Sequence, residues 1–178
     1  LFFTNRGRVY KLNAYEVPEG KRTSKGTAIV NLLQLNPGEK IARTISFNTD
    51  SKENDDLKYL LFATKSGIVK KTPISDFKNI NKSGLIAINL KDGDELIGVN
   101  RTSGEEDIIL VTENGMSIRF NENDVRAMGR TATGVKGITL SKGDQVVSMD
   151  LISNGSDLLV VSEKGFGKRT ETEEYRDR

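Results

Sequence analysis

The 178-residue sequence contains no cysteine, no histidine and no tryptophan. Without cysteine the chain has neither a disulfide framework nor a thiolate metal site. Without histidine it lacks the most common general base and the most common metal ligand. No apolar run approaches the roughly 18 residues that a membrane-spanning helix needs, so we expect no membrane partner. These absences disfavour metalloenzymes and disulfide-stabilised secreted proteins, and a cytoplasmic location is the expectation.

The remaining composition is that of a folded protein. Hydrophobic residues make up 35% of the chain, enough to bury the core of one or two domains. The formal net charge of +2 is too close to zero to indicate a partner by itself. The sequence begins at Leu1 without an initiator methionine. We therefore expect it to be part of a longer protein.

Four segments of the sequence resemble one another. Each has a short apolar run, then a hydroxyl residue three positions before a glycine, and then a second β-rich run. The aligned segments are 1–12, 61–72, 109–120 and 159–170, with anchors at Gly7, Gly67, Gly115 and Gly165. This pattern predicts a β-hairpin whose glycine takes a positive φ. A polar stretch at 48–58 reads as a loop insertion.

A second half follows each of the first three hairpins. Gly26, Gly84 and Gly134 each precede a short apolar segment, for which we predict a third strand at 30–32, 88–90 and 138–140. A polar turn and a further apolar run complete the unit. About four short strands in roughly 50 residues is the size of a propeller blade. We therefore predict an all-β, propeller-like architecture, with residues 1–178 forming one partial domain.

Cations recur at one position of the hairpins. Lys11, Lys71, Arg119 and Arg169 each follow the anchor glycine by four residues, and Lys70 and Lys168 immediately precede two of them. Within the hairpins, the segments 5–11, 65–71, 114–119 and 164–169 carry no acidic residue, whereas the later turns at 37–40, 91–95 and 142–145 are acid-rich. Because repeats around a ring place equivalent residues on equivalent surfaces, we predict a basic rim, with the acidic turns away from it.

More cations occur close to glycine, serine and threonine, which allow cations and backbone N–H groups to meet phosphate oxygens. The additional candidates are Arg8, Arg22, Lys25, Lys82, Arg126, Arg130 and Lys136. Lysine and arginine at strand ends can also serve only to keep an edge soluble. The pattern favours binding of a polyanion, without choosing among duplex DNA, RNA and an acidic protein. Aromatic residues are only 6% of the chain, which disfavours base-stacking recognition of single strands.

Several phrases of the sequence resemble the C-terminal domain of the A subunit of bacterial DNA gyrase, a type IIA topoisomerase. They are NRGRVYKL (5–12), IVNLLQL (29–35), SGIVKKT (66–72), KDGDELIGV (91–99), VRAMGRTATGVKGI (125–138) and GFGKRTETEEYR (165–176). The resemblance implies a β-pinwheel, a ring of six four-stranded blades that exchange strands, of which this chain would contain about four. The family's basic glycine-rich box matches no segment here.

The resemblance also implies a function. The domain would bind and wrap duplex DNA on a basic outer rim without reading its sequence, in support of ATP-dependent negative supercoiling by the holoenzyme. It would hold no catalytic residue and no cofactor, because ATP and magnesium bind elsewhere in the holoenzyme. The implied partners are the rest of the A subunit, the gyrase B subunit, and duplex DNA, at the bacterial nucleoid. Two alternatives are the corresponding domain of topoisomerase IV and a protein-binding propeller module.

Overall fold

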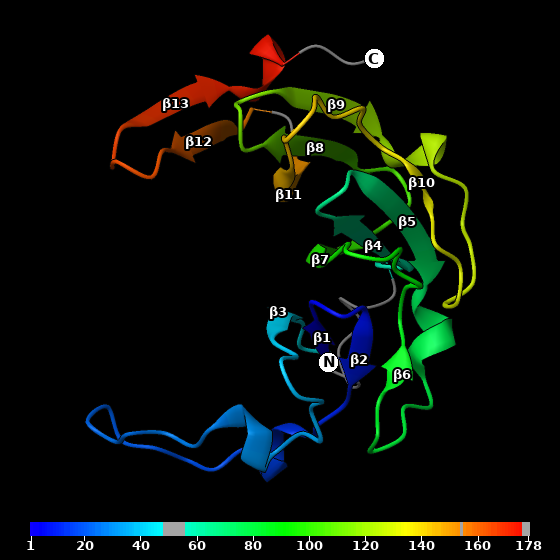
Figure 1. Cartoon of the computed structure of the whole chain (residues 1–178), viewed down its shortest axis with the longest axis vertical. Helices are drawn as coiled ribbons and strands as arrows, with labels where there is room; N and C mark the ends of the chain where they lie inside the picture. Colours follow the sequence, from blue (N-terminus) through cyan, green and yellow to red (C-terminus); the bar gives the residue numbers. More distant parts are fainter. Residues whose placement is uncertain (48–55, 154, 176–178) are drawn as a thin grey trace.

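The computed structural model describes residues 1–47, 56–153 and 155–175. These residues form short antiparallel sheets joined by turns and 3-10 helices, arranged as an open arc (Figure 1). The described residues include no helix that is long and apolar enough to cross a membrane. The predicted insertion at 48–58 falls mostly on residues 48–55, which lie outside the described part of the chain.

Each of the first two sheets has four strands, and one outer strand of each, β6 or β10, comes from the next repeat. The first sheet has the order β3-β1-β2-β6, with β1 at Phe2–Thr4, β2 at Arg8–Tyr10, β3 at Ile41–Thr44 and β6 at Leu85–Ile86. The second has the order β10-β5-β4-β7, with β4 at Tyr59–Thr64, β5 at Ile68–Pro73, β7 at Leu96–Thr102 and β10 at Val135–Lys136. The predicted all-β, strand-exchanging architecture is therefore confirmed.

The last two sheets have fewer strands in the described residues. The third has the order β11-β8-β9, with β8 at Asp107–Thr112, β9 at Ser117–Asn121 and β11 at Val146–Ile152. The fourth is the hairpin of β12, Asp157–Val161, and β13, Gly167–Glu171. The described residues also contain the 3-10 helices η1 at Ala14–Glu16, η2 at Ile29–Asn31, η4 at Ile74–Phe77, η5 at Glu122–Asp124 and η6 at Thr172–Glu174.

The predicted hairpins are present, and their repeated hydroxyl has a clear role. Gly67 takes a φ of 84°, and its N–H donates to the Thr64 carbonyl at 3.0 Å. The Thr64 hydroxyl then accepts from the Ile68 N–H at 3.2 Å. The same hydroxyl-to-backbone bond recurs at Thr4, Thr112 and Ser162. Because the hydroxyl satisfies an N–H that the tight turn leaves unpaired, the sequence repeats it in every unit.

The strands predicted at 30–32, 88–90 and 138–140 are wrong in position. In the second and third repeats the paired residues lie upstream, at 85–86 and 135–136, and residues 29–31 form η2. The Ala87 and Ile88 N–H groups instead both donate to the Gly7 carbonyl, at 2.8 and 3.1 Å. This contact ends the ladder and turns Ile88 into the core, where it is 1% exposed.

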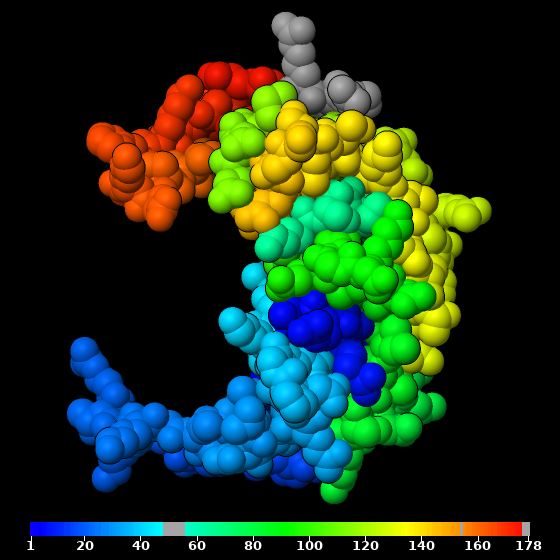
Figure 2. All heavy atoms as spheres, viewed as in Figure 1, coloured from blue at the N-terminus to red at the C-terminus, as the bar shows by residue number. Residues whose placement is uncertain are grey.

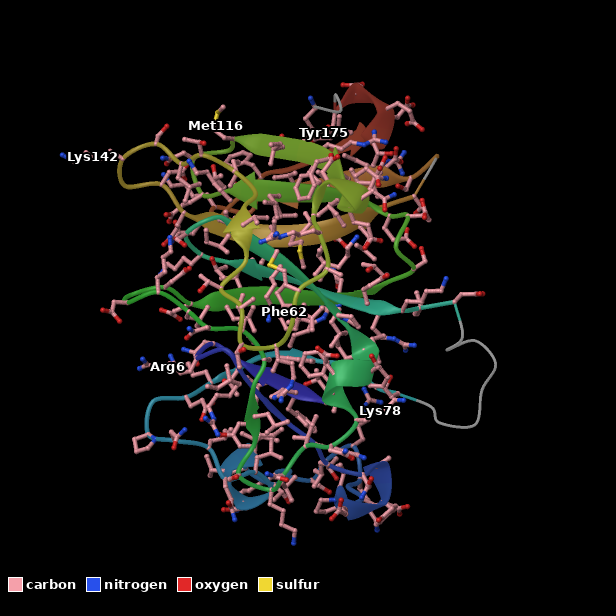
Figure 3. The ribbon with its side chains drawn as sticks, turned by 90° about the vertical axis from the view of Figure 1, so that its right-hand side faces the viewer. Arg6, Phe62, Lys78, Met116, Lys142 and Tyr175 are labelled. Atoms are coloured by element: carbon pink, nitrogen blue, oxygen red, sulfur yellow. The ribbon has the colours of Figure 1, made fainter. Side chains whose placement is uncertain are left out.

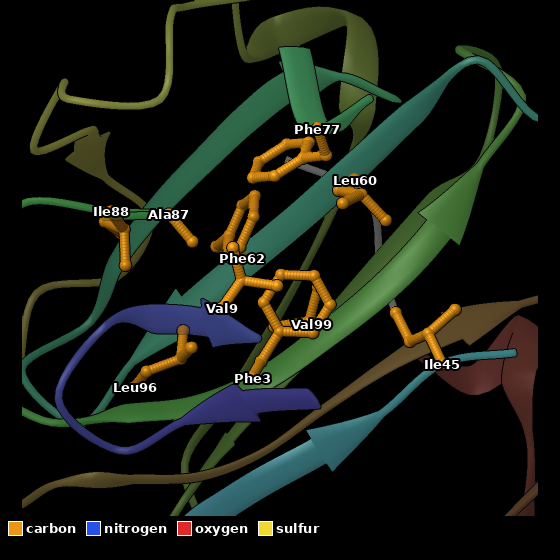
Figure 4. Close-up of a cluster of buried hydrophobic side chains, with 10 residues drawn as sticks. All are labelled: Phe3, Val9, Ile45, Leu60, Phe62, Phe77, Ala87, Ile88, Leu96 and Val99. Atoms are coloured by element: carbon orange, nitrogen blue, oxygen red, sulfur yellow. The ribbon is translucent and has the colours of Figure 1, made fainter. Parts of the chain in front are cut away.

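Two apolar cores lie between successive sheets. The first contains Phe3, Phe62 and Phe77, whose ring centroids are 5.7–6.2 Å apart (Figure 4). The second gathers residues of the second and third sheets, including Leu61, Ile108 and Phe120. Of the apolar residues Leu32, Leu90, Leu140, Val111 and Val161, which lie in the predicted strands, the first four are partly buried. Val161 is 60% exposed, because no described residue covers that part of the β12–β13 hairpin.

Candidate nucleic-acid interface

Four cations occupy the same position of the hairpins, four residues after the anchor glycine: Lys11, Lys71, Arg119 and Arg169. Two of these in-register cations are not on an exposed rim. Lys71 is 5% exposed, and its ammonium lies 3.9 Å from Glu122 Oε2 while donating to the Glu122 carbonyl at 2.8 Å. The Arg119 side chain is 11% exposed, and its guanidinium lies 2.7 Å from Asp107 Oδ2. The prediction that Lys71 and Arg119 are rim cations is therefore wrong. A buried charge is costly unless it is paired and hydrogen-bonded, and both residues have a carboxylate and carbonyl acceptors.

The two buried cations make an equivalent contact. Lys71 donates to the carbonyl of Glu122, and Arg119 donates to the carbonyl of Thr172 at 3.0 Å. Glu122 and Thr172 begin the 3-10 helix that follows the next hairpin along the chain. In the second and third repeats the cation thus ties its sheet to the next one, and this structural contact explains a cation at those two positions without a ligand.

The other two in-register cations are exposed. Lys11 follows β2 and is exposed. The Arg169 side chain is 76% exposed and lies 3.1 Å from Asp157 Oδ2. Because three of the four cations in this register are next to carboxylates, the register does not form the continuous basic rim that the sequence predicted.

The prediction that Lys70 is a rim cation is also wrong, because Lys70 is fully buried. Its ammonium donates to the carbonyls of Ala87 at 2.5 Å, Arg130 at 2.6 Å and Gly129 at 3.3 Å, and lies 5.1 Å from the centre of the Phe62 ring. Ala87 belongs to the second repeat, whereas Gly129 and Arg130 belong to the third. Lys70 therefore joins the strand-donating segments of two neighbouring repeats.

The burial of Lys70 predicts a pH-dependent stability. Burial, and secondly the charge of Arg130, lower its pKa from 10.5 to about 7. Between these values the unfolded chain binds more protons, so the free energy of unfolding should rise with pH, by at most about 1.4 kcal/mol per pH unit. Lys70→Met should remove this rise. Urea denaturation of both proteins between about pH 6 and pH 10 measures it, and parallel stability profiles would contradict the assignment.

The prediction that the acidic turns lie away from the hairpins is wrong. The Asp94 carboxylate accepts from the Ser66 N–H at 2.9 Å, and Asp144 accepts from the Asn114 N–H at 3.1 Å. Glu39 is buried and accepts from the Tyr10 hydroxyl at 3.0 Å. These carboxylates satisfy groups at or beside the hairpin turns, so the acidic turns and the hairpin turns share one edge of the arc. Arg6 and Lys142 accordingly lie on the same side in Figure 3.

Two segments on a different surface collect cations. Strands β6 and β10 are the outermost strands of their sheets and lie on the convex side of the arc (Figure 1). The segments that contain them, 78–90 and 125–141, include lysine and arginine but no aspartate or glutamate. We call the cations on and beside these two strands the convex-face cations; they are Arg8, Lys78, Lys82, Arg126, Arg130 and Lys136.

Hydrogen bonds hold two of the convex-face cations beside β6. Arg8 lies opposite Ile86 in the sheet, and its guanidinium donates to the Ser83 carbonyl at 2.6 Å. The Arg130 guanidinium, from the third repeat, donates to the Ile86 carbonyl at 3.4 Å. Both side chains are half-buried. Arg8 of the first repeat and Arg130 of the third repeat therefore meet at β6 of the second repeat, which Lys82 precedes in the chain.

The other convex-face cations are more accessible. Lys78, Lys82, Arg126 and Lys136 are exposed, and no ion pair involves them within the described ranges. Lys78 lies at the end of η4 and joins the same surface. The exposed ammonium and guanidinium groups are available to phosphate oxygens.

The remaining candidates lie apart from the convex face. Arg22 and Lys25 are exposed on the segment from 13 to 36, which projects from one tip of the arc (Figure 1). Lys168 is exposed on β13, near the other tip. The structure thus brings Arg8, Lys82, Arg126, Arg130 and Lys136 onto one face, and separates them from Lys11, Arg22, Lys25, Lys168 and Arg169.

Comparisons with known proteins agree with this fold. The family model described as DNA gyrase C-terminal domain, beta-propeller, matches residues 1–48, 58–103, 106–153 and 156–178. The DNA gyrase A subunit of Clostridium acetobutylicum is 59% identical over 77% of this chain, and that of Halalkalibacterium halodurans is 53% identical over the same share. In both cases the chain spans only 16% of the relative's length.

Solved structures give the same result. The C-terminal domain of DNA topoisomerase IV superposes with a TM-score of 0.88 at 34% identity, over 99% of this chain and 54% of that domain. A DNA gyrase A C-terminal domain superposes with a TM-score of 0.80 at 32% identity, over 99% of this chain and 55% of that domain. With family matches in all four repeats and close relatives among gyrase A subunits, the chain belongs to the DNA gyrase C-terminal domain family of β-propellers.

Proposed function

We propose that this chain binds duplex DNA along its convex face, without reading sequence, as a non-catalytic part of a gyrase A subunit. The observation that carries the proposal is the position of segments 78–90 and 125–141. They are free of acidic residues and both lie on the outside of a curved surface. The gyrase A subunits among the relatives support the choice of DNA as the polyanion.

The curvature matters because a wrapped duplex must bend. DNA has a persistence length of about 150 bp, so a tight bend costs several kcal/mol. Phosphate contacts spread along a curved protein surface offset that cost, and they do so for any sequence because every nucleotide carries a phosphate. The convex-face cations extend over at least two sheets of the arc, which is the arrangement that such bending requires.

The same proposal includes the larger assembly. By bending DNA, the domain would present a neighbouring duplex segment to the rest of the A subunit, in support of ATP-dependent negative supercoiling together with the B subunit. ATP and magnesium would bind outside this chain. The site of action would be the nucleoid in the bacterial cytoplasm.

Salt dependence tests the DNA-binding proposal directly. The affinity for a fluorescent duplex, measured by anisotropy, should fall linearly with salt on a log–log plot, with a slope of about −0.9 for each phosphate neutralised. With about four to six phosphates contacted, we expect a slope of roughly −4 to −5. Two duplexes of unrelated sequence should bind alike. A salt-insensitive affinity, or no binding at low salt, would overturn the proposal and favour a protein-binding propeller.

The topoisomerase IV domain is the second candidate, because its solved structure superposes with the higher TM-score, 0.88 against 0.80. The two solved domains differ little in identity to this chain, at 34% and 32%. The curated relatives at 53–59% identity are gyrase A subunits. We therefore place the chain with gyrase, and relaxation without supercoiling by the holoenzyme would favour the alternative.

A further inference from the structure

Lys70 carries a charge at a position where the preceding repeat has an uncharged side chain. The equivalent residue of the first repeat is Tyr10, also three positions after the anchor glycine. Tyr10 is 1% exposed and Lys70 is 0% exposed, and each packs beneath a glycine of the following repeat. A Cβ added at Gly84 would lie 2.8 Å from Tyr10 Cε1, and one added at Gly134 would lie 3.1 Å from Lys70 Cβ. An uncharged side chain therefore meets the packing requirement, so packing does not explain the ammonium of Lys70.

The surroundings of the Lys70 ammonium suit its protonated form. Its Nζ donates to three carbonyls, those of Ala87, Gly129 and Arg130. A protonated lysine has three N–H donors and no acceptor, whereas the neutral amine has two donors and a lone pair. Loss of the proton therefore leaves one of the three carbonyls without its donor and turns the lone pair of Nζ towards a carbonyl oxygen.

A second cation, Arg130, is tied to the same stretch of backbone. The Arg130 guanidinium donates to the carbonyl of Ile86, and Lys70 donates to the next carbonyl along the chain, that of Ala87. The main chain of Arg130 is held too, because its carbonyl accepts from Lys70 at 2.6 Å. No described carboxylate forms an ion pair with either cation. Lys70 therefore fixes the main chain of Arg130 beside β6, although the two positive charges repel each other.

The elements packed against Lys70 carry few other charges. Strand β4, whose Phe62 ring faces the ammonium, and residues 84–90 contain no charged residue. The charged residues on the remaining elements are Lys71 on the same strand, Asp76 on η4, and Arg126 and Arg130 on the segment from the third repeat. Burial is the main cause that lowers the pKa of Lys70 to about 7, the charge of Arg130 is the second, and Asp76 opposes both. An anion that neutralises Arg130 removes the second cause and makes Lys70 easier to protonate.

On the basis of the duplex binding proposed above, we propose that Lys70 is a positioning residue for the convex face, and that a DNA phosphate bound at Arg130 favours the protonated form of Lys70. Lys70 does not reach a phosphate itself, because it is 0% exposed. Segment 125–141, yellow in Figure 2, runs along the convex side against the green residues of the second repeat. Lys70 acts on DNA by holding Arg130 of this segment in place. Because protonation and phosphate binding favour each other, DNA binding takes up a proton from the solvent.

The pH dependence of DNA affinity tests this coupling. Because the pKa of Lys70 is about 7 in the free chain and higher in the complex, the affinity should fall as the pH rises above 7. A pKa raised by roughly half to one unit gives a total fall of about three- to tenfold by pH 9. Lys70→Met should bind several-fold more weakly at about pH 6 and show no such fall. Anisotropy titrations of both proteins with one fluorescent duplex measure this, and parallel pH profiles would overturn the inference.

The composition of the chain makes this measurement specific. It contains no histidine and no cysteine, the side chains that ordinarily titrate between about pH 6 and pH 9. The amino terminus also titrates in this range, and its acetylation removes that contribution. The free energy of unfolding is expected to rise with pH through the same lysine, so unfolding does not account for a loss of affinity at high pH.

Arg130→Gln and Lys136→Gln give an independent test that leaves Lys70 in place. Each removes one convex-face cation and should weaken binding by about eightfold at roughly 0.1 M salt. Arg130→Gln should also flatten the pH profile, because the free chain then already lacks the repulsion that DNA relieves. Lys136→Gln is the matched control and should keep the profile, because Lys136 is not among the charges that shift the pKa of Lys70.

Thermal unfolding of each variant confirms that it is folded. Equal pH profiles for the Arg130 and Lys136 variants would overturn the inference, and salt-dependent binding by the wild-type chain would then still support the proposed function. A wild-type chain without salt-dependent DNA binding would overturn both.

Discussion

Lys71→Glu is expected to destabilise the fold by about 3–5 kcal/mol, the usual cost of leaving a buried charge without its partner. The Lys71 ammonium is buried 3.9 Å from the Glu122 carboxylate, which is itself 0% exposed. A glutamate at position 71 would place two carboxylates there. It would also remove the donor to the Glu122 carbonyl and the cation 5.1 Å from the centre of the Tyr59 ring. Because domains of this size are stable by only about 5–15 kcal/mol, much of the stability would be lost.

Urea denaturation measures this effect, and Arg169→Glu is its matched control. Arg169 occupies the equivalent position in the fourth repeat, but its side chain is 76% exposed. Breaking an exposed ion pair costs less than about 1 kcal/mol, so this variant should remain close to wild type. Comparing the stabilities of the two variants shows whether Lys71 has a structural role or contacts DNA. A fully stable Lys71→Glu protein with weakened DNA binding would restore Lys71 to the DNA-binding surface.

Reversing three convex-face cations is expected to reduce DNA affinity by about 500-fold at roughly 0.1 M salt, because each phosphate contact contributes about eightfold there. The variant combines Lys82→Glu, Arg126→Glu and Lys136→Glu. All three side chains are exposed and form no ion pair with any described residue, so the fold should be unaffected. The log–log salt slope should become shallower by about 0.9 for each phosphate that is no longer neutralised.

A second triple variant controls for the change in net charge. Lys91→Glu, Lys142→Glu and Lys164→Glu alter the charge by the same amount, at exposed lysines of the hairpin and acidic turns. These turns lie at one edge of the arc rather than on its convex face, as Lys142 shows in Figure 3. We expect its affinity to fall by less than about tenfold, through long-range electrostatics alone. If this control weakened binding as much as the convex-face variant does, DNA would follow the edge of the arc instead.

Local patterns in the sequence predicted local structure well. A hydroxyl three residues before a glycine specifies the hairpin turn, because both the φ of Gly67 and the Thr64–Ile68 hydrogen bond involve neighbours in the chain. Short apolar runs beside the anchor glycines identified the hairpin strands, and their repetition gave the propeller-like class. The position of the exchanged strand was predicted less well. The pairing ends where the next two N–H groups donate to the carbonyl of Gly7 or Gly67, and these glycines belong to the preceding repeat.

The sequence by itself therefore determined the repeating β-hairpin, the all-β class and a set of candidate cations. Only the tertiary structure decided which cations are accessible. Lys71 and Lys82 are equally charged and hydrophilic in the sequence, but Lys71 meets Glu122, 51 residues away along the chain, whereas Lys82 meets solvent. Burial depends on which distant segment covers a side chain, and a repeat places equivalent residues at contacts between sheets as readily as on an outer face. Stacking of the sheets made one set of cations structural and left another along the convex side of the arc.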